Sequence, residues 1–173
     1  MPRYVALLRG INVGGVRVPM ATLREVAMDL GWSDVSTHLN SGNLLLTADE
    51  PPTAVSERLR AGLVESVGVD TPILVRTPAE LVDAQARNPF AGEAHDERRV
   101  QIAFVADGVT LDGLEPLSSD GPEEVALGAR ELFLHYPDGL ARSRLDLKLV
   151  ERWVGGHATT RGTRTVRGLI ERT

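Results

Sequence analysis

The chain has 173 residues, 42% hydrophobic and 25% charged, so it can bury the core of one domain or of two small subdomains. It contains no cysteine, which excludes disulfides, thiolate zinc sites and a cysteine nucleophile. The net charge of −5 argues against a long nucleic-acid interface, which needs many cationic contacts. No apolar run approaches the ~18 residues of a membrane span and no secretory leader pattern begins the chain, so we expect a cytoplasmic protein without membrane attachment.

The first half of the chain alternates strand and helix patterns. A buried strand is predicted over residues 3–9, and a glycine-rich break follows at 10–15. Pro19 marks the entry of an amphipathic helix that ends at Gly31. Strands at 35–39 and 44–47 flank a turn, and a helix after Pro51 leads to a strand at 72–76. This β-α-β-β-α-β order is that of a ferredoxin-like split βαβ unit.

The sequence of the second half predicts a further α+β subdomain. Thr77 and Glu80 form a capping-box pattern, and the helix that they open is expected to stop near Asn88. A strand at 100–105, a loop at 108–122 and a hairpin with strands 125–127 and 132–136 follow. Ser143, with Asp146 three residues later, is expected to cap a helix, and a polar segment at 159–165 precedes the last helix. The predicted domain organisation is residues 1–76 and 77–173.

The glycine-rich break is the first candidate binding segment. It reads Arg9-Gly10-Ile11-Asn12-Val13-Gly14-Gly15, between a strand and a helix. Backbone N–H groups exposed in such a turn suit an anion. The spacing matches neither the dinucleotide fingerprint nor the Walker pattern. The structural alternative is a connection that needs glycine for its backbone angles.

A second segment, Asn40-Ser41-Gly42-Asn43, suits a tight hairpin turn. The functional interpretation is that Asn40, Ser41 and Asn43 line a pocket as hydrogen-bonding groups. A covalent role for Ser41 is not favoured, because no nucleophile elbow surrounds it and nothing assures that His38 reaches it.

The third segment contains Thr160 and Arg161 before the predicted last helix. An arginine beside hydroxyl groups at a helix start suits a phosphate or carboxylate, although threonines also cap helices. Residues 140–173 carry eight basic and three acidic residues, so this end is locally positive. The four histidines lack metal-ligand spacing, so we predict no metal site and no cofactor.

These segments, together with Asn88-Pro89-Phe90 and Ser143-Arg144-Leu145, resemble the bacterial family called domain of unknown function 1697. The chain differs from that family's usual pattern at His38 and at Gly162-Thr163-Arg164. The resemblance implies an α+β fold with two ferredoxin-like halves packed into one compact unit. It implies no activity.

We therefore expect a cleft between the halves that binds a small anion, a phosphate or carboxylate compound such as a nucleotide. Its predicted lining is Arg9, Gly10, Asn12, Gly14, Gly15, Asn40, Ser41, Asn43, Thr160 and Arg161. Nucleic-acid binding is the second interpretation, and homodimerisation or another protein interaction is the third. The sequence does not decide whether the protein is an enzyme; no acid–base pair is visible, so any catalysis would be electrostatic and positional.

Overall fold

Two four-stranded sheets, each with antiparallel neighbours, organise the chain in the computed structural model, which describes residues 1–115, 117 and 121–173. Five helices precede or follow strands of these antiparallel sheets in the described residues, so the predicted α+β class is confirmed. The chain divides into two compact units, residues 1–81 with 169–173 and residues 82–168, which we call the first and the second half. The sequence analysis placed this boundary at residues 76/77; in the structure it falls within a helix, and the last five residues join the first half.

The first half has the predicted element order. It comprises β1 (Arg3–Leu8), α1 (Met20–Asp29), β2 (Ser33–Thr37), β3 (Asn43–Thr47), α2 (Pro52–Val67) and β4 (Ile73–Arg76). The strands lie in the order β2-β3-β1-β4, so each pair of strands joined by a helix is separated by one strand. This is the split βαβ arrangement.

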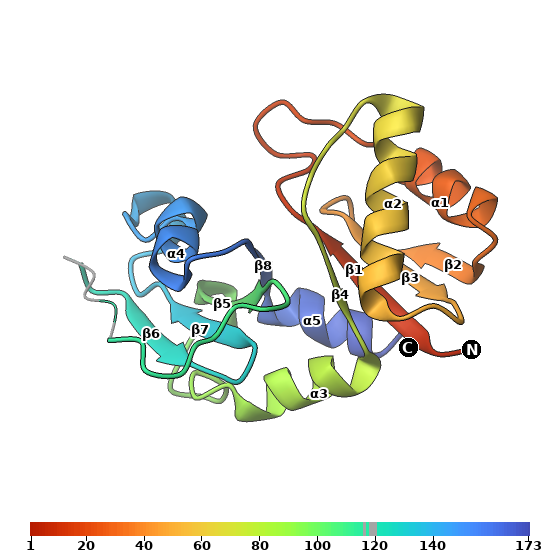
Figure 1. Ribbon diagram of the computed structural model, residues 1–173. Helices are drawn as coiled ribbons and strands as arrows, with labels where there is room; N and C mark the ends of the chain where they lie inside the picture. Colours follow the sequence, from red (N-terminus) through yellow and green to blue (C-terminus); the bar gives the residue numbers. More distant parts are fainter. Residues whose placement is uncertain (116, 118–120) are drawn as a thin grey trace. The chain divides into compact units, whose positions relative to one another are not determined.

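One face of this sheet is covered by α1 and α2 (Figure 1). The stripe Val55, Leu59 and Leu63 of α2 is fully buried, because residues spaced by four lie on one side of a helix. The stripe packs on alternate residues of β1, among them Ala6 and Leu8. The first half therefore has a core of its own.

The second half carries another sheet. Its elements are α3 (Pro78–Arg87, shared with the first half), η1 (Glu97–Arg99), β5 (Val100–Val105), β6 (Glu124–Leu127), β7 (Glu131–His135), η2 (Leu140–Arg142), α4 (Leu147–Val154), β8 (Ala158–Gly162) and α5 (Thr163–Ile170, whose end belongs to the first half). The strand order β6-β7-β5-β8 repeats the pattern of the first sheet. A separate core forms where α4 places Val150 and Val154 against residues of β5 and β7.

Several local predictions are confirmed. Thr77 and Glu80 form the capping box, with the N–H of Thr77 donating to Glu80 Oε2 (2.8 Å) and the N–H of Glu80 to Thr77 Oγ1 (3.2 Å). The strand at 100–105 has the predicted bounds, and the predicted hairpin is formed by β6 and β7. Residues 116 and 118–120 of the predicted loop 108–122 lie outside the described residues.

Two predictions in the last third of the chain were wrong. The cap of α4 is Asp146, whose side chain accepts from the N–H of Leu149 (2.8 Å), whereas Ser143 Oγ accepts from the N–H of Leu145. The segment before the last helix is a strand, β8, that pairs with β5 over its whole length. Arg161 therefore lies within a strand and not at a helix start.

The described part of the chain contains no helix that is both long and apolar enough to cross a membrane.

Candidate functional site

The glycine turn and the asparagine turn, two of the three predicted segments, meet at one end of the first sheet. Asn12 Nδ2 donates to the carbonyl oxygen of Asn40 at 2.6 Å. The N–H of Leu8 donates to the carbonyl oxygen of Gly42 at 2.9 Å, which extends the β1–β3 ladder into the turn. We call the surface formed by residues 9–17 and 38–43 the two-turn surface.

Asn12 and Asn43 hold this surface together. The Asn12 amide also donates to Val18 O (3.0 Å) and accepts from the N–H of Val18 (2.9 Å), so it closes its own loop. Asn43 is fully buried and donates from Nδ2 to His38 O (2.8 Å) and Ser41 Oγ (3.0 Å). Both side chains were predicted as ligand contacts, and the structure gives them a positioning role.

The two turns approach so closely that only glycine fits at position 42. Gly42 has a φ of 77°, and a Cβ there would lie 2.8 Å from the Ile11 side chain and 2.9 Å from Leu8 Cβ. Ile11 is buried, at 1% exposure, so its side chain has little room to move away. Gly42 was predicted as a turn residue, and in the structure it also lies where the asparagine turn packs against Ile11 of the glycine turn.

The outward side of the surface is polar and backbone-rich. Gly10, Gly14, Gly15, Asn40 and Ser41 are all exposed. The N–H groups of Gly14 and Gly15 donate to none of the described residues. Such groups are free to donate to a ligand.

Arg9 follows β1 and is half-buried at the base of the glycine turn. Its N–H donates to Pro72 O (3.0 Å), and its carbonyl oxygen accepts from Thr71 Oγ1 (2.5 Å). These bonds fix the backbone from which the guanidinium group extends.

The two-turn surface is locally positive although the chain is acidic. Residues 9–24 contain Arg9, Arg17 and Arg24 and no acidic residue. Residues 35–48 also contain no acidic residue. Burial, followed by the charge of the nearby Arg172, lowers the pKa of His38, and Glu171 acts in the opposite direction. The sequence analysis missed Arg17, Arg24 and Arg172; the acid-free stretch 9–24 was a signal for the first two.

Each turn also exposes an apolar side chain. Val13 is 67% exposed and Leu39 is 56% exposed. Leu39 has a φ of 58°, a left-handed conformation that is rare for a bulky residue and that clusters at ligand sites. The surface therefore offers apolar contacts beside its polar groups.

The third predicted segment lies in the second half. Thr160 and Arg161 are on β8, and Arg161 is buried, at 6% exposure. Its Nη1 donates to Thr159 Oγ1 and Thr160 O, both at 2.8 Å, and burial lowers its pKa to about 10. The shared cleft between the halves stays a prediction.

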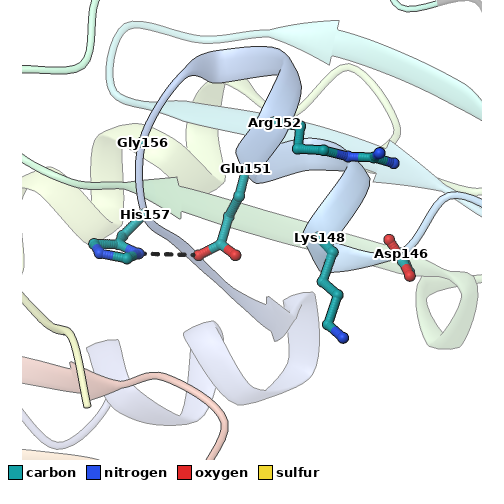
Figure 2. A pocket seen from close by; sticks show the side chains of 6 residues that line it. All are labelled: Asp146, Lys148, Glu151, Arg152, Gly156 and His157. Atoms are coloured by element: carbon teal, nitrogen blue, oxygen red, sulfur yellow. Dashed lines mark ion pairs between the residues drawn. The ribbon is translucent and has the colours of Figure 1, made fainter. Parts of the chain in front are cut away.

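An open pocket of about 640 Å³ lies beside α4 in the second half. It is lined by Asp146, Lys148, Glu151, Arg152, Gly156 and His157. Figure 2 shows that Glu151 turns toward His157, and the two form an ion pair of 3.5 Å between Oε1 and Nδ1. Charges of both signs line this pocket, so it favours no single class of ligand.

The fold and the surface define a class: an α+β protein with two antiparallel sheets of the same strand order and a polar surface of two joined turns in its first half. Residues 1–133 match the family described as "Protein of unknown function (DUF1697)", and the chain belongs to this family. The resemblance seen in the sequence is thereby confirmed.

A similar solved structure is that of the conserved bacterial protein SP0830 from Streptococcus pneumoniae. It is 24% identical, the match covers 98% of this chain and 97% of that one, and the TM-score is 0.75. At this identity the likeness shows the fold alone. None of the curated proteins matches the chain.

Proposed function

We propose that the two-turn surface binds a small anionic ligand through a phosphate or carboxylate group. The observation that carries this proposal is the bond from Asn12 to Asn40, because it gathers backbone donors, hydroxyl groups and arginines at one end of the sheet. In this proposal Gly14 and Gly15 donate through their N–H groups, and Arg9 and Arg17 supply positive charge.

The exposed apolar side chains refine the class of ligand. Val13 and Leu39 stand beside the polar groups and suit a ligand with an apolar or planar part, such as the base of a nucleotide. Inorganic phosphate alone would leave these side chains in water. We therefore expect a nucleotide to bind more tightly than phosphate.

Thermal unfolding against a panel of anions tests the proposal. The panel contains phosphate, sugar phosphates, mononucleotides, citrate and short RNA, with sodium chloride at matched ionic strength. A ligand at ~100 times its dissociation constant stabilises the fold by about 2.7 kcal/mol, which shifts the midpoint visibly. We expect this shift for wild type with mononucleotides.

Three arginine variants locate the site. Arg9→Ala and Arg17→Ala should each weaken binding by about tenfold or more, since a hydrogen bond to a charged group contributes ~1.5–3 kcal/mol. Arg60→Ala is the matched control, because Arg60 is an exposed arginine of the same half that pairs with Asp70 and is not part of the two-turn surface. It should bind like wild type.

Two results would overturn the proposal. One is the absence of any shift with the anions of the panel. The other is a shift that Arg9→Ala and Arg17→Ala leave unchanged. A shift with RNA but with no mononucleotide would instead favour nucleic-acid binding. Self-association stays a separate prediction, which light scattering tests by measuring the molar mass in solution.

A further inference from the structure

We propose that His95, Glu124 and His135 in the second half bind a divalent transition-metal ion of the zinc type. One ligand atom from each of these residues lies within 4.8 Å of the other two. The spacing of the four histidines in the sequence predicted no metal site. The fold brings two of them together with a carboxylate.

Neighbouring strands position two of the ligands. Glu124 is the first residue of β6 and His135 is the last residue of β7, and the two are register partners on the antiparallel pair. Side chains of directly paired residues lie on the same face of a sheet. His95 comes from the loop before η1, which precedes β5, so three separate segments converge.

The distances are close to those of a metal site. His135 Nδ1 and Glu124 Oε2 are 2.7 Å apart, and the His95 and His135 rings meet edge to face with centroids 4.7 Å apart. Tetrahedral zinc, with ligands at ~2.0–2.1 Å, holds its ligand atoms ~3.4 Å from one another. To reach this spacing the 2.7 Å pair must open, and any pair near the 4.8 Å limit of the cluster must close.

A buried nitrogen without a hydrogen-bond partner supports the proposal independently. His95 Nδ1 is buried and bonds to none of the described residues. Leaving such an atom unsatisfied costs ~1–3 kcal/mol. A hydrogen bond between Glu124 and His135 with aromatic packing on Phe90 explains those side chains, but it leaves His95 Nδ1 unsatisfied. A metal ion that His95 binds through Nδ1 satisfies this atom.

The chemistry of the ligands selects the metal. Two imidazoles and one carboxylate suit zinc and its neighbours, whereas magnesium and calcium prefer oxygen ligands. The Glu124 side chain is 54% exposed and that of His135 is 11% exposed, so an ion enters from the Glu124 side. Phe90 lies against both histidine rings, at 5.4 and 5.6 Å between centroids, and forms an apolar wall. Three protein ligands leave one coordination position open.

Calorimetric titration of the untagged, chelator-treated protein with zinc and with magnesium tests the site. We expect one zinc per chain, no comparable binding of magnesium, and visible ligand-field bands when cobalt replaces zinc. His95→Ala and Glu124→Gln should each weaken zinc binding by about tenfold or more. Because the Glu124 side chain is 54% exposed, we expect Glu124→Gln to preserve the fold, so that a loss of affinity in this variant reports on the ligand itself.

His157→Ala is the matched control. His157 is a histidine of the same half that is 65% exposed and pairs with Glu151, so it represents adventitious binding at the surface. We expect this variant to bind zinc like wild type. The proposal is overturned if wild type binds no zinc, if His95→Ala and Glu124→Gln bind it unchanged, or if His157→Ala alone removes the binding.

Discussion

Asn12 and Asn40 are joined by a 2.6 Å hydrogen bond although 28 residues separate them in the sequence. The donor is the Asn12 side chain and the acceptor is the Asn40 backbone. The position of the asparagine turn therefore depends on the identity of residue 12, whereas the side chain of residue 40 remains exposed.

Asn12→Ala is expected to lower the free energy of unfolding by about 2–3 kcal/mol. The change removes three hydrogen bonds, two to Val18 and one to Asn40, and places alanine at a φ of 56°. Asn40→Ala keeps the backbone acceptor and should change stability by less than ~0.5 kcal/mol. Urea unfolding measures both, and equal losses would contradict the proposed asymmetry.

Gly42→Ala should destabilise the protein by more than Gly14→Ala does. Both positions have a positive φ, 77° and 67°, so alanine costs ~1 kcal/mol at each. Only at Gly42 does the new Cβ meet Ile11 and Leu8, at 2.8 and 2.9 Å, which adds ~1–3 kcal/mol. Thermal or urea unfolding of the two variants isolates the steric term, and indistinguishable midpoints would refute it.

Thr159→Val is expected to cost about 1–3 kcal/mol of stability, because it leaves an N–H of the buried Arg161 without its hydroxyl acceptor. Thr160→Val provides the control. Arg161 bonds to the backbone carbonyl of Thr160, which valine retains, and residue 160 points to the other face of β8. The expected change there is below ~0.5 kcal/mol. Losses of the same size would show that the hydroxyl of Thr159 does not hold Arg161.

Tyr136 makes the fold sensitive to alkaline pH. Burial, followed by the charges of Glu123 and Asp146, raises the pKa of this phenol above its ordinary value of 10.0. Above pH 10 the unfolded chain releases the proton while the folded chain keeps it. Stability is therefore lost as the pH rises through and beyond 10.

Tyr136→Phe tests this pH dependence. At pH 7 the variant should be about 1 kcal/mol less stable, because the 3.2 Å bond from the phenol to Leu145 O is lost. Between pH 9 and 11 its stability should fall less steeply than that of wild type. Urea unfolding at each pH gives both quantities, and parallel pH profiles would contradict the assigned pKa direction.

Local signals predicted much of the fold. The capping box at Thr77 and Glu80, the helical stripe of α2 and the strand at 100–105 depend on residues a few positions apart, so the sequence displays them directly. The polar turns at 10–15 and 40–43 were recognised for the same reason. The cap of α4 was misassigned because both Ser143 and Asp146 are good capping residues and only the geometry distinguishes them.

The sequence alone thus determined the α+β class, the family and two of the segments that meet at the two-turn surface. Tertiary structure decided which residues lie close together. It pairs β8 with β5, joins Asn12 to Asn40, and brings His95, Glu124 and His135 into one cluster. The physical reason is the distance along the chain over which each kind of signal acts. Periodicity and capping act within a turn or two of the chain, whereas strand register and side-chain clusters depend on packing between segments far apart in sequence.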